Sequence, residues 1–145
     1  MKILAWLLPV LLLSCKGDPE IILNNTELLT ESDWIVESGT VDPPQNGSND
    51  YFDLVGECAR DDVYMFNRNF SLVIDEDTVL CDTTQTANGA WSFNTEETQL
   101  LLNRNDLPVP LLFNIVVINE EMMILDLDTL VIEAVGFSLN LKFVH

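Results

Sequence analysis

A strict alternation of apolar and polar residues near the end of the chain constrains the fold more than any other feature of the sequence. The apolar positions of this run are Phe137, Leu139, Leu141 and Phe143, and they alternate with Ser138, Asn140, Lys142 and Val144. A period of two residues with one apolar face predicts a half-buried antiparallel strand. Because one strand cannot bury its apolar face alone, the rest of the chain should supply its partners.

Short apolar-rich runs bounded by turn residues predict eight strands in all. They cover residues 34–41, 62–67, 70–75, 89–93, 98–103, 111–118, 122–132 and 137–144. Short, evenly spaced strands without a long helical segment indicate an all-β fold, either a sandwich or an up-and-down barrel.

Two connections are less regular than the strands. Asp42-Pro43-Pro44 should end the first strand, because proline cannot donate a hydrogen bond to a sheet. Residues 45–61 then form a long loop, and a loop of this length is usually functional or tied by a disulfide. Residues 21–30 either continue an N-terminal tether or form a short helical turn, and we favour the turn.

The residues predicted to face inward are bulky. They are Trp34, Phe66, Phe70, Leu72, Ile74, Trp91, Phe93, Leu100, Phe113, Leu125, Leu127, Phe137, Leu139, Leu141 and Phe143. An eight-stranded barrel has an interior that side chains can fill or that can hold one small ligand. A packed core with a shallow mouth is therefore at least as consistent with this set as a deep apolar cavity.

The N-terminus carries the pattern of an export signal. Lys2 precedes an apolar run from Ile3 to Leu13, which is too short to span a bilayer, and the run ends in Leu12-Leu13-Ser14-Cys15. This ending resembles the lipobox of bacterial lipoproteins, which implies removal of residues 1–14 and a diacylglycerol on Cys15. The alternative is a buried N-terminal helix or strand.

This interpretation divides the chain into a signal peptide (1–14), a lipidated cysteine with a polar tether (15–27) and one domain (28–145). The sequence has 24 acidic and 6 basic residues, a net charge of −18. Such a surface disfavours nucleic acids and electrostatic binding to anionic membranes, so acyl chains at Cys15 must supply the membrane affinity. The charge is equally consistent with a simple solubility role.

Assigning Cys15 to lipid leaves Cys58 and Cys81. In an exported, oxidising compartment such a pair predicts a disulfide. A metal site is the alternative, but no second cysteine lies near either residue and the single histidine is His145. We expect no metal and no cofactor.

No catalytic motif is present in the sequence. His145 is terminal and expected to be mobile, and neither a Gly-x-Ser-x-Gly nor a His-Glu-x-x-His motif occurs. The closest carboxylate clusters, Asp61-Asp62, Asp75-Glu76-Asp77 and Glu120-Glu121, fall at predicted turns or strand ends, where acidic residues are ordinarily solvated. We expect a protein that is not an enzyme.

Several segments together resemble the small lipidated lipocalin-like proteins of Gram-negative bacteria. They are Leu28-Leu29 before Trp34, Asp42-Pro43-Pro44, Asp50-Tyr51-Phe52 with Cys58, Cys81, Gly89-Ala90-Trp91-Ser92-Phe93 and the closing trio of strands. The resemblance implies an eight-stranded antiparallel barrel, closed at one end by Trp34 and open at the other. It also implies a monomer anchored to the outer membrane, facing the periplasm or the cell surface.

For this family we expect a small hydrophobic or amphipathic ligand, with residues 45–61 as a lid. The candidate ligand-binding residues are Trp34, Tyr51, Phe52, Phe70, Trp91, Phe113, Phe137 and Leu139. Tyr51 and Phe52 either gate the mouth or pack over the open end near Cys58. The alternative function is that of a filled barrel that contacts another envelope protein.

Overall fold

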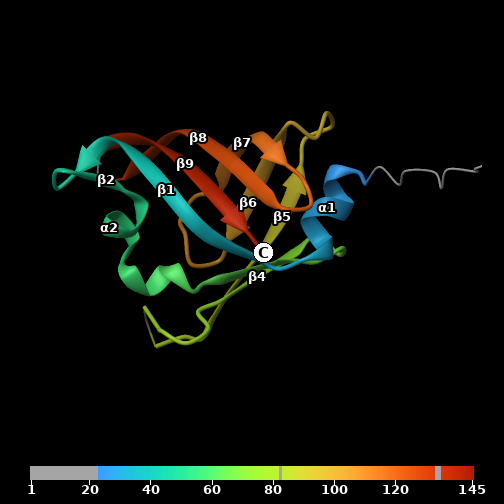
Figure 1. The fold of residues 1–145 in the computed structure, drawn as a ribbon, viewed down its shortest axis with the longest axis horizontal. Coiled ribbons are helices and arrows are strands. Elements are labelled where there is room, and N and C mark those ends of the chain that lie inside the picture. The colour runs from blue at the N-terminus through green and yellow to red at the C-terminus, as the bar shows by residue number, and fades with distance from the viewer. Residues whose placement is uncertain (1–22, 82, 133–134) are drawn as a thin grey trace, which may run out of the picture.

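A computed structural model describes residues 23–81, 83–132 and 135–145, which form a closed antiparallel β-barrel of eight strands with short helices (Figure 1). The strands are β1 (Trp34–Gln45), β2 (Ser48–Asp50), β3 (Val63–Phe66), β4 (Ser71–Asp75), β5 (Thr86–Phe93), β6 (Gln99–Arg104), β7 (Leu111–Ile118), β8 (Met122–Ile132) and β9 (Val135–Val144). The helices are α1 (Asn25–Glu31), α2 (Tyr51–Val55) and the 3₁₀ turn η1 (Glu57–Arg60).

The barrel closes because β9 pairs with β1, for example at Val41 and Leu139. Strands β3 to β9 follow one another as antiparallel neighbours, and β1 also pairs with β3 through Trp34 and Tyr64. Strand β2 is an addition outside this ring and pairs with the second half of β1. Closure pairs both edges of the sheet, so the predicted barrel is confirmed over the sandwich.

Strand β1 is longer than the sequence suggested. It continues through Pro43 and Pro44 to Gln45, and the Asp42–Pro43 peptide is cis. The pairing with β2 is irregular between Thr40 and Gln45, so both prolines lie in a bulge, where proline is tolerated. The prediction that the strand ends at Asp42 was therefore wrong.

One contiguous cluster of buried side chains fills the barrel. Its members are Leu29, Trp34, Val36, Val41, Tyr51, Phe52, Tyr64, Phe66, Leu72, Ile74, Trp91, Leu100, Leu102, Phe113, Met123, Leu125, Leu127, Phe137, Leu139, Leu141 and Phe143. Phe93 is partly buried and packs against this cluster. The predicted inward set is thus confirmed at every position except Phe70.

Phe70 lies outside the barrel because it belongs to the turn between β3 and β4. Its side chain is 55% exposed and its φ of 66° is in the left-handed region, which is unusual for a bulky residue. The Phe70 ring packs on Trp91 with the ring centroids 5.2 Å apart. The expectation that Phe70 faces inward was wrong, since the alternation of β4 does not extend into the turn.

Helix α1 closes the Trp34 end. It begins with a capping box between Asn24 and Glu27, and its buried Leu29 accepts a hydrogen bond of 3.0 Å from the Trp34 indole. The helical turn expected for residues 21–30 is thus confirmed from Asn25 onward. His145 also packs on Trp34, with ring centroids 4.0 Å apart.

Helix α2 covers the opposite end of the barrel, so this end is not open as expected. Figure 1 shows α1 at the right-hand end of the barrel and α2 at the left-hand end. The predicted loop of residues 45–61 holds β2, α2 and η1. The predicted signal peptide and Cys15 lie outside the described residues, and within the described part no helix is long and apolar enough to cross a membrane.

Candidate functional site

Polar side chains gather inside the barrel beneath α2, and we call Tyr51, Asp62, Tyr64 and Arg104 the mouth cluster. Asp62 and Tyr64 are buried and alternate with the half-buried Val63, so both face the interior. Arg104 follows the buried Leu102 by two residues on β6 and faces the same way. The Tyr64 hydroxyl interacts with Tyr51 and with the Arg104 guanidinium.

The charge of Arg104 is matched by Asp106. The guanidinium donates two hydrogen bonds to this carboxylate, with Nε to Oδ1 at 3.0 Å and Nη2 to Oδ2 at 2.6 Å. Burial alone would lower the pKa of Arg104, but the bond to Asp106 and the nearby tyrosines outweigh it and raise that pKa. The same bond lowers the pKa of Asp106. Arg104 and Asp106 therefore form an ion pair in which the carboxylate neutralises the guanidinium charge.

Asp62 is the least satisfied member of the mouth cluster. The residue is 8% exposed, and its Oδ1 is the one buried side-chain polar atom in the described part of the chain without a hydrogen-bond partner. Burial raises the pKa of Asp62 to about 6, and repulsion from Glu76 and Asp61 adds to this effect against the opposing Arg104. Leaving a buried acceptor unpaired costs about 1–3 kcal/mol, so Asp62 is suited to receive a donor.

The burial of Asp62 corrects one expectation from the sequence. The pair Asp61-Asp62 was expected to be solvated at a turn. Asp61 is half-buried and its carboxylate accepts hydrogen bonds from the connection between β4 and β5, whereas Asp62 is buried. Asp62 instead occupies the first inward position of the pattern that continues through β3. That alternation was the signal that would have found it.

Helix α2 covers the mouth cluster, and we call residues 51–55 the lid. Asp50 caps the helix by accepting a 2.9 Å hydrogen bond from the Phe52 N–H. A Cβ at Gly39 would lie 2.7 Å from the Tyr51 Cβ, so the lid packs this closely only because position 39 is glycine. The lid ends at Gly56, whose φ of 109° favours glycine.

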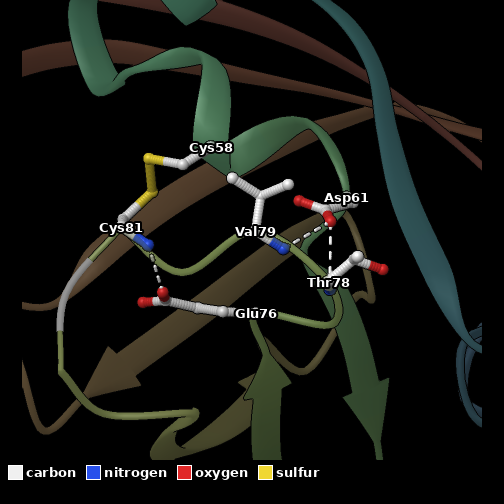
Figure 2. Close-up of a disulfide and its surroundings, with 6 residues drawn as sticks. All are labelled: Cys58, Asp61, Glu76, Thr78, Val79 and Cys81. Atoms are coloured by element: carbon white, nitrogen blue, oxygen red, sulfur yellow. Dashed lines mark hydrogen bonds between the residues drawn. A yellow bond between two sulfur atoms is a disulfide. The ribbon is translucent and has the colours of Figure 1, made fainter.

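A disulfide fastens the segment after the lid. Cys58 of η1 is bonded to Cys81 in the connection from β4 to β5, as the sequence predicted, with Cα atoms 5.2 Å apart (Figure 2). The Asp61 carboxylate accepts hydrogen bonds from the Thr78 and Val79 N–H groups at 3.1 and 2.9 Å. Because these bonds join the same two segments as the disulfide, the base of the lid is held to the barrel.

The structure does not bring the predicted ligand-binding residues together in one pocket. Those that pack in the barrel core are Trp34, Trp91, Phe113, Phe137 and Leu139. Tyr51 and Phe52 are buried in the lid, in agreement with packing over the end of the barrel, whereas Phe70 is outside. Asp62, Tyr64 and Arg104 were not predicted as site residues, because Asp62 was expected to be solvated and because the contact of Tyr64 with Arg104 joins β3 to β6, which are far apart in the sequence.

Two clefts of the described part of the molecule lie outside the lumen. One, of about 380 Å³, is lined by Leu23, Leu28, Glu31, Ser32, Glu120 and His145 at the α1 end. The other, of about 190 Å³, lies over β1, β8 and β9. Among the described residues, no group of three or more His, Cys, Asp or Glu side chains is placed to hold a metal ion.

Comparison with known proteins adds no name to this site. No protein-family model matches the chain, and no curated protein is similar to it at a significant level.

Proposed function

We propose that this protein is a lipid-anchored, lipocalin-like envelope protein that binds a small amphipathic molecule at the mouth of its barrel, beneath the lid, and is not an enzyme. The observation that carries the proposal is the unpaired Oδ1 of Asp62 in a buried polar layer. Buried polar groups are nearly always hydrogen-bonded, so an orphaned acceptor under a short helix calls for an explanation. A ligand that donates a hydrogen bond to Asp62 would explain why this acceptor has no partner within the protein.

The packing below the mouth limits the size of this ligand. Phe66, Ile74 and Leu102 are buried side chains of the cluster that fills the lumen. Because these side chains fill the lumen, a ligand in the proposed site inserts at most a short apolar tail once the lid has moved. Its binding energy comes from burial of the tail at about 25 cal/mol per Å², together with the head-group contacts.

Ligand entry requires the lid to move, and its short length and its flanking segments are consistent with such a movement. It has five residues, follows the short strand β2 and ends at Gly56. The disulfide at Cys58 holds the chain just after Gly56, so motion is confined to the lid itself. Opening moves Tyr51 with the lid and exposes the rest of the mouth cluster, while the barrel strands stay paired.

The cellular setting follows from the N-terminal sequence. A signal ending in Ser14-Cys15 supports export and acylation, and the disulfide supports an oxidising compartment. A ligand held by an anchored barrel is received, stored or handed on at the outer membrane.

Amide NMR of the full chain tests the proposal. A panel of water-soluble amphiphiles with four- to six-carbon tails should shift the backbone signals of Tyr51, Asp62 and Tyr64. An Asp126→Asn variant on the outer face serves as the matched control and should respond as the original protein does. Absence of mouth shifts at millimolar concentrations, or shifts confined to the outer clefts, would refute ligand binding at the mouth.

A second candidate function is an interaction module with a filled barrel, and a specific surface favours it. Val55, Val79 and Leu80 are large apolar side chains exposed near Cys58 and Cys81 in the sequence. Exposed apolar side chains grouped on a charged protein are typical of a docking surface. Charge substitutions at Val79 and Leu80 that abolish a specific cross-link to one envelope protein, without unfolding the barrel, would favour this function.

A further inference from the structure

We infer that the mouth cluster selects a ligand whose head group is a protonated amine. This inference rests on the proposed binding of a ligand at the mouth and goes further by naming the head group. It follows from the acceptor that is free, from the charges around it and from the tyrosine hydroxyls of the mouth cluster.

The free acceptor is Oδ1 of Asp62. Among the described residues it is the buried side-chain atom that lacks a partner, and its position on the inward face of the chain directs it into the barrel. The missing partner must donate a hydrogen bond, and an ammonium group donates the strongest kind to a carboxylate. An ammonium also neutralises a charge that burial otherwise penalises.

The charges around Asp62 disfavour an anionic head group. Arg104 is the nearest cation, but Asp106 already holds its guanidinium through two hydrogen bonds. Asp61 and Glu76 add negative potential at Asp62. A carboxylate ligand would be repelled by three acidic side chains, whereas a cation is attracted by them and by the net charge of −18.

Two tyrosine hydroxyls complete the site. Tyr51 and Tyr64 are both buried, their hydroxyls interact with each other, and the charge of Asp62 acts on both of them. The hydroxyls offer further hydrogen bonds, which an amine with several N–H groups can use.

Three ligands of six carbon atoms each separate the possible head groups: hexylamine, hexanol and hexanoate. Their binding to the full chain is measured by amide NMR at pH 7.5, where hexylamine is protonated. We expect hexylamine to bind most tightly and to shift Asp62 and Tyr64. Asp62→Asn should weaken hexylamine at least about tenfold and leave hexanol unchanged, since one charge-assisted hydrogen bond is lost.

Asp77→Asn is the matched control, because Asp77 is an exposed carboxylate of the connection from β4 to β5, outside the lid and the mouth cluster. It removes the same charge from the same end and should leave hexylamine binding within about twofold. If both variants weaken binding equally, general electrostatic attraction explains it and the amine site is refuted. If Asp62→Asn fails to fold, the ranking of the three ligands on the original protein decides alone.

The remaining outcomes separate the inference from the proposed function. Tighter binding of hexanoate at the mouth, lost in Arg104→Met, would overturn the amine head group but keep a ligand-binding mouth. Equal binding of hexylamine and hexanol would also overturn it. No binding of any of the three would reject the proposed function as well.

Discussion

At the scale of single residues, Asp62 sets how the stability of the barrel changes with pH. Its pKa is about 6 in the folded protein against a usual value of 3.8, so between these values the folded state holds a proton that the unfolded chain has lost. The free energy of unfolding therefore falls as the pH rises from about 4 through about 6, and this effect is nearly complete about one pH unit above 6.

Asp62→Asn should remove this part of the pH dependence. We expect the free energy of unfolding above pH 6 to rise by about 1–3 kcal/mol, because an unpaired charge no longer has to be buried. Denaturation in urea between pH 4.5 and 8 measures it, with Asp77→Asn as the control that stays close to the original protein. Parallel curves for Asp62→Asn and the original protein would contradict the assignment.

Phe70 and Phe66 provide a contrast between an exposed and a buried ring in one hairpin. Phe70→Gly loses a surface contact with Trp91 but relieves a positive φ, so the free energy of unfolding should change by less than about 1 kcal/mol. Phe66→Ala opens a cavity in the core and should cost about 3–5 kcal/mol. Equal losses in the two variants, measured by thermal or urea denaturation, would place Phe70 in the core after all.

These residues show where the alternating pattern can be trusted. Leu72 and Ile74 were predicted correctly because they lie within a paired strand. Phe70 lies just before β4, where turn geometry decides which way its side chain points, so placing it inside was wrong. Asp62 keeps the alternation of β3, but its charge led to the expectation that it is solvated, and this was wrong as well.

At the scale of elements, the disulfide ties η1 to the connection between β4 and β5. The two cysteines are 23 residues apart, and closing a loop of this length stabilises the fold by about 3 kcal/mol in the chain-entropy model. A double Cys58→Ser, Cys81→Ser variant should lose this amount in urea denaturation. The original protein treated with a reductant is the control and should lose as much, and a loss below about 0.5 kcal/mol would show that the bond is not structural.

Gly39 of β1 is the position against which Tyr51 of the lid packs. In Gly39→Val the new side chain would overlap Tyr51 and Leu141, which a Cβ at this position already meets at 2.7 and 2.6 Å. We expect a loss of about 1–3 kcal/mol and faster hydrogen exchange of the α2 amides, with β7 unaffected. Thr40→Val, at the exposed neighbouring position, is the control, and unchanged exchange in α2 would mean that the lid does not depend on Gly39.

The elements differ in how well the sequence predicts them. Strands β7 and β8 were located to the residue because turn residues bound long apolar runs. The lid was missed because five residues are too few to establish a helical period, and its cap at Asp50 is a local contact. The length of β1 was missed because tolerance of Pro43 and Pro44 depends on the bulge opposite β2, which is a tertiary feature.

At the scale of the whole molecule, closure of the barrel and the acidic surface act together. Pairing of β1 with β9 removes the free edges through which sheets associate. A net charge of −18 adds repulsion between copies and between the protein and anionic membranes. This charge disfavours electrostatic binding of the folded domain to anionic membranes, and in the proposed lipoprotein the acyl chains at Cys15 supply the attachment instead.

Cys15→Ala tests this division between anchor and domain. Without the thiol no diacylglycerol can be attached, and in the proposed lipoprotein the acyl chains supply the membrane affinity, at about 0.8 kcal/mol per buried methylene. Labelling with radioactive palmitate should disappear, and the variant should no longer fractionate with membranes after an alkaline wash that leaves lipid-anchored proteins in place. Ser14→Ala, which keeps a small residue before the cysteine, is the control and should retain the label. Labelling that persists in Cys15→Ala would refute the lipid anchor, and the unfavourable charge would then require a protein partner to explain any membrane association.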